Sequence, residues 1–200
     1  MNWNAHLPAL LLAVPLFGAF ASPVLSPFGR TTRNALLAGL SFVTLLVSLL
    51  LMKSVLAGGT AVYVMGGEST GLALPLGMKL PIRIIMEVDA FSAFMAVCGT
   101  VASFAGALFS MNYMDKFTAL GRFVSLYFLL TLGMLGMMIT GDIFNFFVFL
   151  EIASIASIGL IAFWRDRPEA VEASFKYMLI SQVSSMDANS RKTKKLKMSP

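Results

Sequence analysis

One carboxylate near the middle of a long apolar stretch is the residue of this chain best suited to proton chemistry. Residues 141–163 read GDIFNFFVFLEIASIASIGLIAF, with Glu151 close to the centre. A charge near the centre of a bilayer costs roughly 2.5 to 3.5 kcal/mol, so such a residue faces a protein interior or a water-filled path. A movable cation beside it would let its proton come and go. We therefore predict that Glu151 transfers protons; the alternative is a neutral glutamic acid hydrogen-bonded between helices.

Three further polar residues could support this site. Ser154 lies one helical turn after Glu151, so it shares its face and could hydrogen-bond it or hold a water. Asp142 stands where the helix would begin, and capping explains it without any role in ion movement. Lys176 follows on the predicted cytoplasmic side, where it could serve as an entry or coupling charge for protons or simply neutralise lipid phosphate. We predict Lys176 as a second proton-transfer residue.

The composition indicates an integral membrane protein. Of the 200 residues, 58% are hydrophobic and only 12% are charged, whereas soluble domains are about one quarter charged. The formal net charge of +5 comes mostly from the stretch 187–200, which has five basic residues and one acid, so we expect contact with anionic lipid and no nucleic-acid partner. The sequence has no nucleotide-binding loop, zinc or haem spacing, or nucleophile constellation. We expect no cofactor, no metal and no catalysis by this chain itself.

Five segments are long and apolar enough to cross a bilayer, which takes about 20 residues of helix. They cover 7–24, 35–55, 91–113, 123–140 and 143–164. Basic residues fall in the connections after the first, third and fifth segments, and the positive-inside rule makes that side cytoplasmic. The rule therefore places the N-terminus outside. These connections contain Arg30, Arg33, Lys116, Arg122, Arg165 and Arg167, while Trp3, Tyr113 and Trp164 lie where interfacial anchors are expected.

The remaining segments are of other kinds. Residues 60–67 and 80–88 are rich in β-branched residues and are separated by glycines and Pro75, which predicts a β-hairpin on the outer surface between the second and third helices. Asp89 would then cap the third helix. After the fifth span, a helix starting at Pro168 has an apolar part only about half the membrane thickness, so we predict a short interfacial or re-entrant sixth helix. The fold class is all-α integral membrane, with a transmembrane part at 1–186 and a basic cytoplasmic tail at 187–200.

Several motifs resemble a known family. The Gly-Asp opening, the Asn and Phe residues and the embedded glutamate of residues 141–163 look like the fifth helix of the antiporter-like subunits. These subunits are shared by Mrp-type cation/proton antiporters, respiratory complex I and energy-converting membrane-bound hydrogenases. Further similarities are YVMGG at 63–67, EVDAFSAFM at 87–95 and ASFKYMLISQVSS at 173–185. The D-type Mrp subunit and the related subunits of archaeal hydrogenase and sulfur-reducing complexes are the most similar branches.

The resemblance implies a role and a set of partners. Glu151 corresponds to the proton-relay glutamate of the first half-channel, which in the family pairs with a lysine on the seventh helix. The family fold has about fourteen helices with two inverted repeats. The similarity ends near residue 185, so we expect a truncation after about the start of the sixth helix, either natural or through a frameshift.

Three functions follow from these observations. The first is a shortened antiporter-like subunit of a multi-subunit respiratory, hydrogenase-like or Mrp complex in the plasma membrane, contributing to proton or sodium movement with partner subunits. The second is a structural or assembly subunit that transports nothing. The third is an independent small transporter acting as a homo-oligomer.

The predicted orientation can be tested by thiol labelling. In a Cys98→Ala background, Ser190→Cys should resist an impermeant thiol reagent in intact cells, because the positive-inside rule keeps the basic segment in the cytoplasm. Ser69→Cys, in the predicted outer connection, should be labelled under the same conditions. Labelling of Ser190→Cys before the membrane is opened would contradict the prediction.

Overall fold

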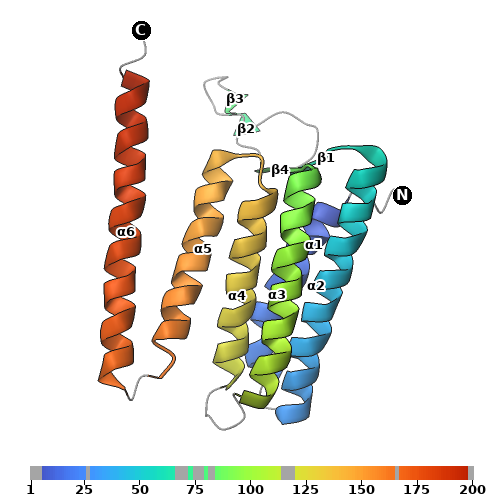
Figure 1. Cartoon of the computed structure of the whole chain (residues 1–200), viewed down its shortest axis with the longest axis vertical. Helices are drawn as coiled ribbons and strands as arrows, with labels where there is room; N and C mark the ends of the chain where they lie inside the picture. Colours follow the sequence, from blue (N-terminus) through green and yellow to red (C-terminus); the bar gives the residue numbers. More distant parts are fainter. Residues whose placement is uncertain are drawn as a thin grey trace. The chain divides into compact units, whose positions relative to one another are not determined.

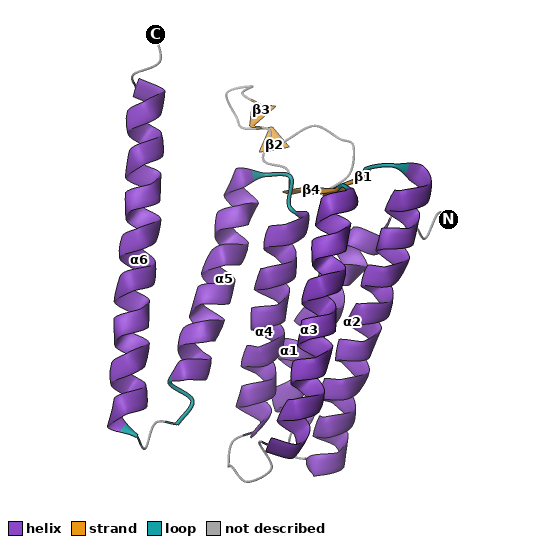
Figure 2. Cartoon of the chain, in the orientation of Figure 1, coloured by secondary structure: helices purple, strands orange, loops and turns teal. Residues whose placement is uncertain are grey.

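The computed structural model describes residues 6–25, 28–65, 72–73, 79–80, 84–113, 120–164 and 167–197. The predicted anchor Trp3 and the loop residues Lys116 and Arg165 lie outside these ranges. Helices dominate the described part, with a few short strands (Figure 2). The chain divides into two compact units, residues 1–153 and 154–200.

Five helices are long and apolar enough to cross a membrane, as the sequence predicts. They match the predicted spans closely, except that the second begins five residues earlier, and none of the five contains more than two charged residues in its most apolar part. Their bounds are α1 (Leu7–Leu25), α2 (Arg30–Gly58), α3 (Ala90–Tyr113), α4 (Leu120–Ile139) and α5 (Ile143–Ile161) (Figure 1).

Helices α1 to α4 form a bundle in which α1 packs against α2 and α4, and α3 packs against α2 and α4. The apolar core has two parts. One lies toward the strands and contains Leu11, Leu51 and Leu135, all fully buried. The other surrounds Phe128, which is 1% exposed and lies against Gly18 of α1.

The contact between α1 and α4 is stabilised by hydroxyl groups. Pro23 lies inside α1 and has no N–H, so it leaves the carbonyl of Ala19, four residues earlier, without its helical donor. Ser125 of α4 donates its hydroxyl to this carbonyl at 2.5 Å. In the opposite direction, Ser22 of α1 donates to the carbonyl of Gly121 at 2.8 Å. Two serines, one on each helix, thus donate hydrogen bonds to backbone carbonyls across the contact between α1 and α4.

Small and hydroxylated residues also fill the contacts that α3 makes. Ser48 of α2 and Thr100 of α3 are buried and their hydroxyls lie 2.7 Å apart. Between α3 and α4, the Ser103 hydroxyl lies 3.3 Å from that of Thr131, and Tyr127 donates its hydroxyl to the Ser103 carbonyl. Close approach of helices through small residues is typical of membrane proteins.

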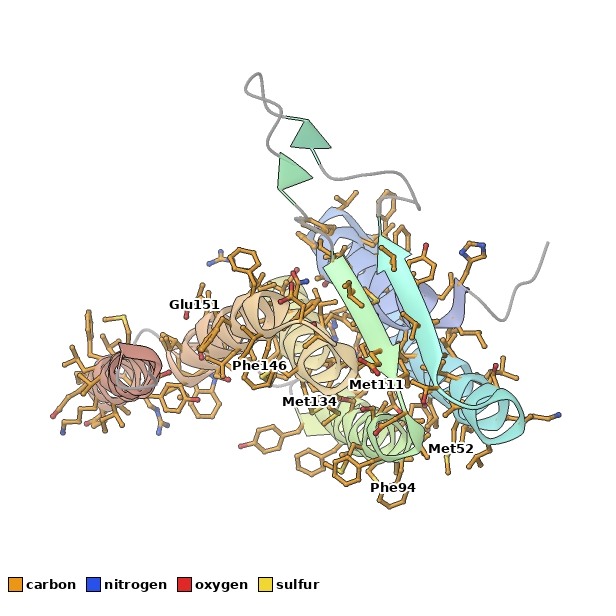
Figure 3. The ribbon with its side chains drawn as sticks, turned by 90° about the horizontal axis from the view of Figure 1, so that it is seen from above. Met52, Phe94, Met111, Met134, Phe146 and Glu151 are labelled. Carbon is orange, nitrogen blue, oxygen red and sulfur yellow. The ribbon has the colours of Figure 1, made fainter. Side chains whose placement is uncertain are left out.

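The β-hairpin predicted between the second and third spans is present. Strand β1 (Ala61–Met65) pairs antiparallel with β4 (Ile84–Val88), with Tyr63 opposite Met86. Within the connection, β2 (Leu72–Ala73) pairs with β3 (Lys79–Leu80). Met86 and Val88 are 1% and 0% exposed and belong to the core of the bundle, so β1 and β4 cover one end of the helices (Figures 1 and 3).

The predicted cap of the third helix is also present. The Asp89 carboxylate accepts a hydrogen bond from the Ser92 N–H at 2.7 Å, and the Asp89 carbonyl accepts one from Ala93 at 2.9 Å. The Ser92 N–H favours the ionised carboxylate and lowers the pKa of Asp89 below its usual value. This cap joins the end of β4 directly to α3.

The sixth helix is longer than the short helix predicted from the sequence. Helix α6 runs from Pro168 to Lys197 without interruption and includes residues 187–197, with all five basic residues of the basic segment. Pro168 starts the helix and Glu169 lies in its first turn, where a negative charge is favourable. Lysine and arginine are good helix formers and are favourable near a helix C-terminus, so the basic residues extend the helix instead of ending it. Helix α6 is not among the five candidate spans.

The serine contact between α1 and α4 gives a stability prediction. Ser125→Ala should lower the stability of the protein in detergent by about 1 kcal/mol, because it leaves the Ala19 carbonyl without a donor inside the bundle. Thermal unfolding would measure the change.

Ser110→Ala is the matched control, because Ser110 bonds the carbonyl of Gly106 within its own helix. Equal losses in both variants would show that the Ser125 contact contributes nothing beyond a local hydrogen bond.

Candidate functional site

Glu151 is the one carboxylate within the described spanning helices α1 to α5. It is the ninth of the 19 residues of α5, so it lies roughly 12 Å along the helix axis from Ile143. Its side chain is half-buried (Figure 3). The predicted location of a carboxylate at the centre of an apolar helix is thus confirmed.

A seam of glycines holds α5 against α4 near this residue. A Cβ placed on Gly133 of α4 would lie 2.7 Å from the Ala153 nitrogen and 2.8 Å from the Phe149 carbonyl oxygen. One turn further along, a Cβ on Gly136 would overlap the Phe149 ring. Only glycine allows this approach, so the two backbones touch on either side of Glu151. Sequence reasoning missed this seam, because its two sides are distant in the chain.

Asp142 caps the N-terminus of α5, as predicted. Its carboxylate accepts hydrogen bonds from the Phe144 N–H at 2.9 Å and from the Asn145 side-chain amide at 3.1 Å. Its carbonyl accepts the Phe146 N–H at 3.0 Å. Asn145, the Asn of the motif that resembles the family, is 5% exposed, and the sequence alone predicts no role for it. The two residues together fix the first turn of the helix that carries Glu151.

The residue before this cap lies directly on the hairpin. The Gly141 N–H donates to the Ile85 carbonyl of β4 at 3.0 Å, and Thr140 pairs with Met86 as an isolated antiparallel bridge. A Cβ on Gly141 would lie 2.9 Å from the Cβ of Glu87. The Gly-Asp opening of the α5 segment thus combines a close backbone contact with a helix cap.

Ser154 belongs to the second unit. It is buried, and its hydroxyl accepts a long hydrogen bond of 3.5 Å from Ser181 of α6. Helical geometry puts Ser154 one turn beyond Glu151 on α5, as predicted, and Ser181 is a further polar residue that the sequence reasoning missed. A small polar contact therefore joins the second half of α5 to α6.

Lys176 also belongs to the second unit and lies on the surface of α6. Its amine forms an ion pair of 2.6 Å with Glu172, four residues earlier, and both side chains are more than half exposed. Between α5 and α6, the Arg167 guanidinium lies 5.5 Å from the centre of the Trp164 ring. Lys176 thus has a partner of its own on its helix.

Within the described residues, no group of three or more His, Cys, Asp or Glu side chains could hold a metal ion. Cys98, the single cysteine of the chain, is exposed on α3.

Comparison with known proteins shows which proteins this chain resembles. The family described as "NADH dehydrogenase I, subunit N related protein" matches residues 117–190. The NADH-quinone oxidoreductase subunit N of Desulforudis audaxviator (strain MP104C) is 32% identical over 88% of this chain and 34% of its own length. The D-type component of a probable K(+)/H(+) antiporter of Rhizobium meliloti (strain 1021) is 30% identical over 92% of this chain and 33% of its own length. The chain thus spans about one third of the length of these relatives.

Comparison of the fold with solved structures gives similar relatives. The membrane-bound sulfane sulfur reductase, an archaeal respiratory membrane complex, contains a chain that is 32% identical, with a TM-score of 0.73 over 90% of this chain and 34% of that one. With its five apolar helices, this chain is a multi-pass membrane protein. Its sequence and its fold are those of the antiporter-like subunit superfamily, over about one third of the length of its relatives.

Proposed function

We propose that this chain is an antiporter-like subunit of a larger ion-translocating complex in the plasma membrane, and that Glu151 exchanges a proton during ion movement. The observation that carries the proposal is the position of Glu151, the one carboxylate of α1 to α5, half-buried at the middle of α5. Retaining an ionisable group at this depth costs free energy, which a proton-exchanging role accounts for.

The surroundings of Glu151 suit such a role. Helix α5 is fixed to α4 through Gly133 and is capped by Asp142, so its central carboxylate has a defined place. Proton exchange depends on such fixed geometry, because a donor and an acceptor must come within hydrogen-bond distance of each other. We assign Asp142 to capping and Ser154 to holding a hydrogen-bond partner, Ser181 of α6.

The proton must come from and pass to other groups. A cation near Glu151 would favour its ionised form, and withdrawal of that cation would favour protonation. We propose that partner membrane subunits supply this charge, as the names of the relatives, subunits of oxidoreductase and antiporter complexes, suggest. Lys176 is exposed on α6, and we propose it as a charge through which protons enter or through which the chain is coupled to its partners.

The proposed role requires no catalysis by this chain. Oxidoreductase chemistry, where the complex has it, would take place in another subunit, and this chain would move protons or sodium ions. The ion is H⁺ at Glu151 itself, and Na⁺ is the alternative for the complex as a whole.

A structural or assembly subunit is the second candidate. The observation that favours it is the extent of close helix packing, including the glycine contacts of α4 and the hydroxyl contacts between α1 and α4. A subunit that only supports its neighbours would need these contacts and would not need the carboxylate of Glu151.

Glu151→Gln in the assembled complex separates the two functions. It should lower ion-coupled turnover by at least about tenfold, because proton-transfer groups typically contribute about 10²–10⁴-fold. The measurement is turnover of the complex in membrane vesicles, normalised to the amount assembled.

Glu169→Gln is the matched control, because Glu169 is exposed in the first turn of α6 and the same chemical change there removes no intramembrane carboxylate. Turnover at the wild-type level in Glu151→Gln, with normal assembly, would establish the structural alternative.

The assignment of Asp142 is tested by two substitutions. Asp142→Asn should keep both helix capping and turnover, because asparagine caps helices about as well as aspartate. Asp142→Ala should lower the stability of the protein by about 1 kcal/mol, measured by thermal unfolding in detergent. Loss of turnover in Asp142→Asn at full stability would contradict the assignment and indicate an ionic role.

A further inference from the structure

We propose that the contact between Gly141 and strand β4 sets the depth at which α5 holds Glu151 in the membrane. This inference rests on the proposed function of Glu151 and adds the residues that place it. Gly141 and Glu87 are then positioning residues, which act on proton transfer through the helix and do not touch the proton. The hairpin would serve as a fixed support for the start of α5.

Strand β4 is suited to act as a support because it is anchored in the bundle. Its residues Met86 and Val88 are 1% and 0% exposed, and they belong to the core formed by α1, α2, α3 and α4. Pairing with β1 over five residues stiffens the strand further. Moving β4 along the membrane normal would therefore disturb the packed end of four helices.

The turn between α4 and α5 is joined to this strand through its backbone. The Gly141 N–H bonds the Ile85 carbonyl at 3.0 Å, and Thr140 pairs with Met86. Gly141 is not among the positive-φ glycines of the described chain, which are Gly29 and Gly59. Glycine is thus needed at this position for space, because a Cβ would lie 2.9 Å from the Glu87 Cβ and 3.2 Å from its Oε2.

Capping does not explain this contact. The cap of α5 is complete without β4, since Asp142 bonds the Phe144 N–H and Asn145. The end of α4 is likewise closed by its own helix, where the Thr140 N–H bonds the Gly136 carbonyl at 3.1 Å. The contact of Gly141 with Glu87 therefore does something other than begin or end a helix.

The link from Gly141 to Glu151 is short and stiff. Helix α5 begins at Ile143 and has no proline or glycine before Glu151, so a shift at its start is carried along its axis. Glu151 lies ten residues after Gly141, roughly 13 Å along the axis from the cap. A displacement of about 1 Å between reacting groups can cost on the order of 10²-fold in rate, so a small axial shift matters for proton transfer.

The depth of position 151 in the membrane can be measured by thiol labelling, which does not depend on ion transport. In a Cys98→Ala background, the reaction rate of Glu151→Cys with a water-soluble maleimide reports how deep this position lies in membranes that contain the assembled complex. Adding Gly141→Ala should change this rate severalfold. Adding Gly39→Ala should not, because a Cβ on Gly39 of α2 meets nothing within 4 Å.

A second substitution should reverse the effect. Glu87→Gly removes the Cβ and carboxylate that a Gly141→Ala side chain would meet, leaving the backbone nitrogen at 3.5 Å, an ordinary contact. In the Glu151→Cys protein, the combination of Gly141→Ala with Glu87→Gly should be labelled at the same rate as Glu87→Gly alone. In a protein that keeps Glu151, Gly141→Ala alone should lower the turnover and shift its pH profile. Combining Gly141→Ala with Glu87→Gly should restore both the turnover and the pH profile.

Each outcome of these experiments supports or overturns the inference about Gly141 or the proposed function of Glu151. An unchanged labelling rate in Gly141→Ala overturns the inference, whatever Glu151 does. Failure of the double variant to restore rate and turnover also overturns it, including where Gly141→Ala alone does not assemble. Normal turnover in Glu151→Gln together with a reversible change in depth would instead overturn the proposed function, and with it the claim that the contact serves proton transfer.

Discussion

Within the hydrocarbon of a bilayer no water can bond a free backbone group, and α1 shows what this constraint demands. Pro23 removes one helical donor and would leave the Ala19 carbonyl unsatisfied. The donor comes from α4, through the Ser125 hydroxyl at 2.5 Å. The proline in one helix and the serine in another act together, so this hydrogen bond favours packing of α1 beside α4 in a membrane.

The same constraint explains the chemistry of the other contacts. Ser48 and Thr100 satisfy each other between α2 and α3, and the Tyr127 hydroxyl finds a backbone carbonyl on α3. Apolar helices gain little from meeting one another in lipid, because lipid is as apolar as leucine, so hydroxyl pairs and glycine approaches specify which helices are neighbours. Glu151 is of another kind, since an ionisable carboxyl group at that depth costs free energy that helix packing alone does not require. Its retention therefore points to proton chemistry more than to stability.

Local features of the sequence predicted much of this structure. Hydrophobic length predicted five spans, and short-range capping chemistry predicted the roles of Asp89 and Asp142. Alternation and turn residues predicted the hairpin. The missed packing contacts depend on a partner in another helix, such as Gly133 of α4 against Ala153 of α5, where a glycine in an apolar helix does not indicate what approaches it. The length of α6 differs for another reason: the prediction of a short helix rests on the length of its apolar part, whereas lysine and arginine are good helix formers and extend the helix beyond it.

The Gly-Asp pair at the start of α5 shows why local and distant constraints must be read together. Asp142 performs a local task, binding the first turn of its own helix, and aspartate or asparagine alone would suffice for it. Gly141 performs a distant task, since its missing side chain leaves room for β4, a strand from a much earlier part of the chain. A cap fixes where along the sequence a helix begins, but it does not fix where that point lies in the membrane. Contact with an anchored strand fixes the depth of the helix start in the membrane. For a helix with one carboxylate at its centre, this depth determines which groups the carboxylate can reach.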